Sequence, residues 1–101
     1  MLPFKSLDAV SGTTAGSIRD LEDSLGGHTM IVKVVGAPTA ARVDLIGGHE
    51  PSAMVGLGTY VYGDASGGIV HVDRVVRYVR AEVVELDGGT NPSITATIAS
   101  C

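Results

Sequence analysis

The stretch VRYVRAEVVELDGGTNPSITATIAS, residues 76–100, carries the clearest structural pattern in the chain. Apolar residues recur at every second position on both sides of a turn cluster, DGGTNP, at residues 87–92. The alternating apolar positions are Val79, Ala81, Val83, Ile94, Ala96 and Ile98. A period of two places these side chains on one face of each strand, and the Gly, Asn and Pro residues between the runs favour a turn. The stretch therefore predicts a C-terminal antiparallel hairpin with a longer loop.

The preceding sequence contains further short runs that are typical of strands. Residues 28–35 (HTMIVKVV) are rich in β-branched residues and nearly continuously apolar, which predicts a central strand covered on both faces. Apolar and charged residues alternate in residues 41–46, and residues 69–73 lead directly into the C-terminal stretch. Two glycines interrupt residues 53–62 and predict a bulge or a close backbone approach there.

Composition and turn spacing together predict the fold class. Apolar residues make up 45% of the chain but aromatic residues only 4%, so the core must consist of small aliphatic side chains. Gly- and Pro-containing turn clusters separate many short runs, which favours an all-β fold. We expect an antiparallel β-sandwich, jelly-roll or immunoglobulin-like, of about six to seven strands. Its expected core comprises Val32, Val34, Val43, Leu45, Val79, Ala81, Val83, Ile94 and Ile98.

The N-terminal quarter has the weakest pattern. Residues 1–12 predict an N-terminal arm that lies over a surface, followed by a single β-sandwich domain over residues 13–101. In residues 17–25 the spacing of Ile18, Leu21 and Leu25 fits either a short helix or an extended edge segment. An isolated helix of this length is marginal, so the extended alternative is favoured.

Charge and cysteine content exclude several functional classes. The formal net charge is −4, and nucleic-acid binding needs clustered Lys and Arg. No run approaches the roughly 20 apolar residues that span a bilayer. The N-terminal residues do not resemble a signal peptide, so we expect synthesis in the cytoplasm. The single cysteine, Cys101, excludes an internal disulfide and is expected to be an exposed thiol.

No residue pattern predicts catalysis, a metal or a cofactor. His28, His49 and His71 lack the short paired spacing of zinc ligands, so we expect unrelated surface or half-buried histidines. The acidic run Asp20, Glu22 and Asp23 could join Glu50 at a calcium site, but it lacks the spaced loop of such sites and favours a solvated edge.

Glycine pairs at 26–27, 47–48, 67–68 and 88–89 lack the strand–loop–helix context of a phosphate-binding loop and are expected in turns. No Gly-x-Ser-x-Gly motif occurs. We expect a protein that is not an enzyme.

Two groups of residues are candidates for docking a partner. Tyr78 and Arg80 share one face of a strand and could combine with the other tyrosines, although Arg80 could instead pair with a strand charge such as Glu82. An apolar N-terminal group could contact a partner or merely cap the sandwich. This group comprises Leu2, Pro3 and Phe4.

Most of the chain, residues 11–100, resembles small β-sandwich proteins encoded among the virion structural genes of tailed bacteriophages. The resemblance rests on Ser11-Gly12, VDLIGGH (43–49), VRYVRA (76–81), LDGGTNPS (86–93) and TATIA (95–99). These motifs mark strands and turns, so the resemblance implies a structural or binding role and no catalytic centre.

The resemblance implies a minor capsid or decoration protein that docks on the major capsid protein at the virion surface and stabilises the lattice. It also implies a homo-oligomer, with a trimer as one option, and neither nucleic acid nor membrane as partner. The alternative is a tail- or fibre-associated module that binds carbohydrate. The family often has an aromatic residue after the loop at His49, where this chain has AMV (53–55), which weakens the sugar-binding alternative.

Overall fold

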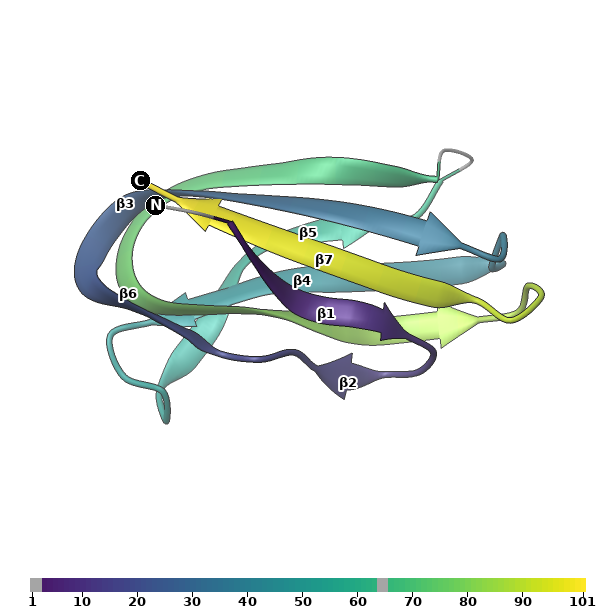
Figure 1. Cartoon of the computed structure of the whole chain (residues 1–101), viewed down its shortest axis with the longest axis horizontal. Coiled ribbons are helices and arrows are strands. Elements are labelled where there is room, and N and C mark those ends of the chain that lie inside the picture. Colours follow the sequence, from purple (N-terminus) through teal and green to yellow (C-terminus); the bar gives the residue numbers. More distant parts are fainter. Residues whose placement is uncertain (1–2, 64–65) are drawn as a thin grey trace.

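The computed structural model describes residues 3–63 and 66–101 and shows an antiparallel sheet folded into two layers (Figure 1). The strands are β1 (Phe4–Val10), β2 (Thr14–Ala15), β3 (Arg19–Val35), β4 (Ala40–Gly48), β5 (Met54–Val61), β6 (Gly67–Asp87) and β7 (Ser93–Ser100). They are hydrogen-bonded in the order β1-β7-β3-β6-β4-β5, and β2 pairs with β6. The predicted all-β antiparallel sandwich is confirmed.

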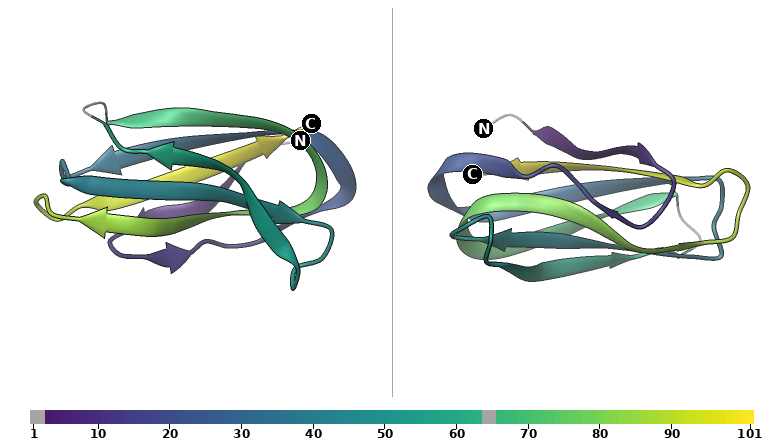
Figure 2. Two further views of the ribbon diagram at one scale, coloured as in Figure 1. Left: turned by 180° about the vertical axis from the view of Figure 1, so that it is seen from behind. Right: turned by 90° about the horizontal axis from the view of Figure 1, so that it is seen from below.

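Two long, bent strands belong to both layers. Residues 27–33 of β3 pair with residues 67–73 of β6 in the first layer, which β7 and β1 complete. Beyond its bend, β6 pairs with β4 over residues 78–87, and β4 pairs with β5 in the second layer. The view from below in Figure 2 shows the two layers joined at one end by these bends. The sandwich is therefore one continuous sheet folded over itself.

A buried histidine connects the two bends to the C-terminal strand. His28 is fully buried, and its Nε2 lies 2.9 Å from the carbonyl oxygens of both Leu25 and Arg74. Because both neighbours are acceptors, Nε2 carries the proton, and Nδ1 lies 2.7 Å from the hydroxyl of Ser100. The prediction of a surface or half-buried histidine is wrong here, since hydrogen bonding satisfies both ring nitrogens.

The core contains all nine predicted residues. Each of them is at most 3% exposed, and Val79, Ala81 and Val83 face inward as the alternation predicted. Leu7, Leu21, Met30 and Val76 join the same cluster. Small aliphatic side chains thus fill the space between the layers, as the composition required.

The C-terminal hairpin predicted from residues 76–100 is not formed. Strand β7 pairs with β1 and β3, so the loop after Asp87 connects the two layers instead of two neighbouring strands. Gly88 and Gly89 have φ angles of 74° and 77°, which glycine adopts without strain. The alternation correctly identified the buried faces, but it does not specify which strand is the hydrogen-bonded neighbour.

The N-terminal segment is a strand rather than an arm. Residues 4–10 form β1, an edge strand on β7, and Leu7 is only 1% exposed. Two register shifts interrupt the pairing, and Ala9 has a φ of 48°. These irregularities break the period of two, which is why the sequence showed no strand pattern.

Strand β3 also departs from expectation. Residues 28–35 lie between two neighbouring strands, but only one face is covered, since Ile31 and Val35 are 51% and 52% exposed. Residues 19–25 are extended, as favoured, with Glu22 at a φ of 64° in an irregular stretch before the bend. The helical alternative is therefore wrong.

Three of the four glycine pairs lie in strands, and only 88–89 lies in a turn. At Gly68 the reason is the close approach of the two layers, because a Cβ there would lie 2.7 Å from the Tyr60 ring. The expected bulge in β5 is present, since the register shifts between the pairs Leu45–Gly58 and Ile46–Gly56.

The thiol of Cys101 is exposed, as expected. Within residues 3–63 and 66–101, no helix is long and apolar enough to cross a membrane.

Replacing Val83 by Asp should place an unpaired carboxylate between the layers. We expect the free energy of unfolding to fall by about 3–5 kcal/mol, measured by urea denaturation. The matched control is Val35→Asp, at a half-exposed position on the outer face, which should cost less than about 1 kcal/mol. Equal effects of the two substitutions would contradict the packing described above.

Candidate functional site

An apolar groove lies at the bend end of the sandwich. It has a volume of about 430 Å³ and is formed by the end of β4, the loop that follows, the start of β5 and the bend of β6. The lining residues are Gly47, Gly48, His49, Glu50, Ala53, Val55, Leu57, Arg74, Val75 and Val76. We call this feature the bend groove.

The base of the bend groove depends on a glycine and a bulge. The register shift in β5 leaves Leu57 without a partner on β4. A Cβ on Gly47 would lie 2.7 Å from Cδ1 of Leu57 and 3.2 Å from Cγ2 of Val76. The side chains of Leu57 and Val76 therefore occupy the space above Gly47 and form an aliphatic surface.

The mouth of the bend groove combines exposed valines with charges of both signs. Val55 and Val75 are 65% and 59% exposed, so two large aliphatic side chains line one groove without being covered. Glu50 and Arg74 are also exposed there, and Arg74 Nη1 donates a 2.8 Å hydrogen bond to the carbonyl of Asp73. The described residues that line the groove include no Phe, Tyr or Trp. Such a surface can accept an aliphatic side chain and orient the segment that carries it.

Tyr78 and Arg80 lie together on the outer face of the second layer, because Val79 between them faces the core. The Arg77 guanidinium lies 5.4 Å from the centre of the Tyr78 ring. Arg80 Nη2 lies 3.1 Å from Oε1 of Glu82. The predicted alternative, in which Arg80 pairs with Glu82, is therefore present in the structure, and it reduces what Arg80 offers to a partner.

Of the other two tyrosines in the suggested patch, Tyr60 and Tyr62, the first faces elsewhere. Tyr60 is 8% exposed and points between the layers against Gly68, and burial raises the pKa of its hydroxyl. Tyr60 therefore does not join Tyr78 and Arg80 on one surface.

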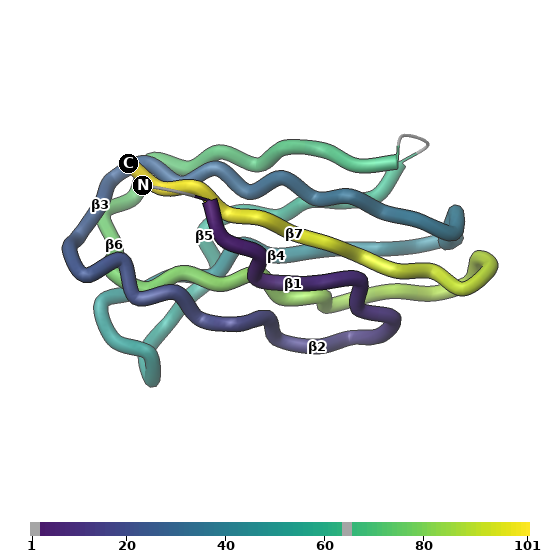
Figure 3. Tube along the Cα trace, in the orientation of Figure 1, coloured from purple at the N-terminus to yellow at the C-terminus, as the bar shows by residue number. Residues whose placement is uncertain are grey.

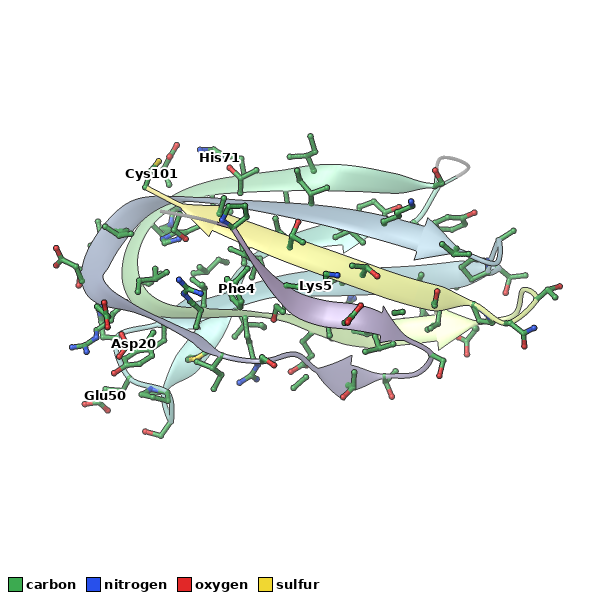
Figure 4. All side chains as sticks on the ribbon, viewed as in Figure 1. Phe4, Lys5, Asp20, Glu50, His71 and Cys101 are labelled. Atoms are coloured by element: carbon green, nitrogen blue, oxygen red, sulfur yellow. The ribbon has the colours of Figure 1, made fainter. Side chains whose placement is uncertain are left out.

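The acidic residues considered for calcium do not assemble around a site. Asp20 accepts two hydrogen bonds from Arg77, at 2.8 and 3.1 Å, and these contacts lower the pKa of its carboxyl. Figure 4 shows Asp20 and Glu50 both near the bend end of the sandwich. Among the residues that the structure describes, no three His, Cys, Asp or Glu side chains form a group that could hold a metal.

The N-terminal docking candidates lie apart from Tyr78 and Arg80. Phe4 is half-buried and packs against the core, with the Arg19 guanidinium 5.5 Å from the centre of its ring. Pro3 is exposed, and Leu2 lies outside the described residues. The sequence thus suggested two docking groups that the fold does not join. It missed the bend groove, whose lining residues become neighbours only through the β5 bulge and the β6 bend.

Deleting residues 1–8 should lower the melting temperature by more than about 10 °C, because it removes Leu7 from the core. It also removes Ser6, whose hydroxyl donates to Ser17 O and accepts from Ala81 N. Deleting only residues 1–3, which precede β1, is the control and should change it little. An unchanged melting temperature after the longer deletion would restore the interpretation of this segment as a detachable arm.

The absence of a bound metal stays a prediction. After dialysis against a mild chelator, elemental analysis should find far less than one zinc or calcium per chain, because Asp20 is committed to Arg77 and His28 to backbone carbonyls. One metal per chain would contradict it.

No family model and no curated protein matches the chain. Among solved structures, the crystal structure of the SPBc2 prophage-derived protein YomS is similar, with a TM-score of 0.67 and 15% identity over 99% of this chain and 92% of that chain. The PBSX exported protein XepA has a TM-score of 0.61 and 15% identity, and the match covers 97% of this chain but 37% of XepA.

The carbohydrate-binding module CBM36, solved in complex with calcium and xylotriose, has a TM-score of 0.56 and 15% identity over the whole of both chains. At these identities the comparisons establish the β-sandwich fold alone.

Proposed function

We propose that this chain is a non-catalytic structural protein of a bacteriophage particle that docks on a protein partner through the bend groove. The observation that carries the proposal is the aliphatic mouth of the groove, where Val55 and Val75 remain more than half exposed. Exposed aliphatic surface of this kind gains free energy when a partner covers it.

The chemistry of the bend groove favours a protein segment as its ligand. Burying an aliphatic side chain contributes about 1.5–3 kcal/mol, and the groove volume of about 430 Å³ leaves room for more than one such side chain. Glu50 and Arg74 at the mouth can pair with opposite charges on the partner, which adds orientation more than affinity.

The fold likeness to two prophage proteins supports a phage origin and agrees with the resemblance carried by residues 43–49 and 76–81. Within that setting we propose the major capsid protein as the partner and the capsid surface as the location. A lattice presents many identical sites, so an oligomer of this chain that occupies several of them at once binds more tightly than a single weak contact allows.

A tail- or fibre-associated carbohydrate-binding module is the second candidate, because CBM36 has a similar fold. Sugar sites usually contain an aromatic ring on which the pyranose stacks. Tyr78 on the outer face is only partly exposed and lies outside the bend groove, and the Arg77 guanidinium lies close to its ring. The aliphatic bend groove therefore favours the protein partner over the glycan.

Replacing Val55 by Asp should weaken binding to purified capsids at least about tenfold, because it places a charge in the apolar mouth of the groove. The matched control is Val61→Asp on the same strand, where the valine is 68% exposed, against 65% for Val55, but lies outside the groove. Binding is measured by co-sedimentation with capsids that lack this protein. Equal binding of both variants would contradict docking through the groove, and a specific glycan-array signal would favour the second candidate.

A further inference from the structure

The first part of β6 forms an edge of the first layer. Residues 67–73 pair with β3 on one side, in a regular register from Gly67–Lys33 to Asp73–Gly27. Among the described strands, none pairs with their other side. Figure 3 shows this segment along the upper border of the molecule, with β3 as its neighbour. One row of its backbone N–H and C=O groups is therefore open to a partner strand, except that the Asp73 carbonyl already accepts a hydrogen bond from Arg74 Nη1.

The other edges of the sheet carry features that discourage pairing, and this edge does not. Strand β1 has two register shifts and the charged Lys5 and Asp8, β5 has a bulge, and β2 is two residues long. Residues 67–73 (GGIVHVD) contain no proline, lysine or bulge, and Ile69 is 68% exposed. A regular, apolar edge strand without such protection is a template for pairing with another chain.

We propose that a second copy of this chain pairs antiparallel with this edge, about a twofold axis at Val70. Val70 is the midpoint of residues 67–73, so this register overlaps all seven residues. It places Ile69 opposite His71 of the second copy, and Gly67 opposite Asp73 of the second copy. The twofold axis makes the interface self-complementary, because every contact occurs twice.

Charge complementarity selects a second copy and this register. Lys33 is exposed, is the cross-strand neighbour of Gly67, and forms no ion pair among the described residues. Because Gly67 has no side chain, Lys33 can extend across it towards Asp73 of the second copy, about two strand spacings or roughly 10 Å away between Cα atoms. The Asp73 side chain is 81% exposed and held by His71, whose Nε2 lies 3.1 Å from its Oδ1.

The surface at the edge has space for this contact. A shallow depression of about 370 Å³ lies over Gly67 and Gly68, between Ile31, Lys33 and Ile69. In the paired register, the end of the partner edge that carries Asp73 lies beside this depression. A register shifted by two residues would place His71 of the second copy opposite Gly67 and lose both ion pairs.

The test uses the symmetry of the interface and sedimentation equilibrium of the full chain. The wild type should dimerise, whereas Lys33→Glu and Asp73→Lys, each alone, should raise the dimer dissociation constant at least about tenfold, because each creates two like-charge contacts. An equimolar mixture of these two variants should form a heterodimer, in which both contacts again join opposite charges. Lys5→Glu and Asp8→Lys on the β1 edge are the matched controls and should leave dimerisation unchanged.

Thermal melts of the variants establish that each is folded. A wild type that stays monomeric up to about 1 mM would overturn the proposal. A dimer that tolerates both edge substitutions, or single variants whose mixture gains no heterodimer, would overturn it as well. Capture of a strand from a different protein by a monomeric wild type would assign the edge to another partner.

Discussion

The two-layered fold depends on the hydrogen bonds of the buried His28 imidazole. They connect the bend of β3, the bend of β6 and the end of β7, which lie side by side where the single sheet folds into two layers. The Nε2–H of His28 donates to carbonyls at the bends of β3 and β6, and its Nδ1 contacts the last residue of β7. A side chain unable to donate would remove the hydrogen bond to two partly buried carbonyls, at a cost of about 1–3 kcal/mol in total. The bend groove depends on the same arrangement, since Arg74, whose carbonyl His28 binds, begins the segment of β6 that lines it.

The close packing of the two layers also explains two of the strand glycines. Where β5 passes beneath the first part of β6, a Cβ on Gly58 would lie 2.8 Å from Val70, and one on Gly68 would lie 2.7 Å from Tyr60. Larger residues at these positions would separate the layers and open the aliphatic core. These glycines therefore act through packing, whereas Gly88 and Gly89 act through their positive φ angles.

The sequence predicted the faces of strands better than their neighbours. Alternation placed Val43, Leu45 and Val79 in the core, because a period of two reports directly on burial. It could not show that β6 and β7 lie in different layers, since the same alternation satisfies either pairing. The register shifts in β1 removed the alternation by which a strand is recognised in the sequence. The bend groove was missed because it brings together residues more than twenty positions apart in the chain. Geometry between elements, which no local pattern encodes, accounts for what was missed.

The two proposed surfaces are compatible in one assembly. Antiparallel pairing at residues 67–73 places the bend of one copy beside the opposite end of the other, because the bend follows directly after Asp73. The two bend grooves would then lie at opposite ends of one continuous sheet. A dimer that pairs in this way would bind two partner molecules, one through each bend groove. A repeating lattice contains such pairs of partner molecules. Once one groove of the dimer is bound, the second groove is held near the next partner molecule. The effective concentration of the second groove at that site is therefore raised, and the dimer binds more tightly than one groove alone without any new contact.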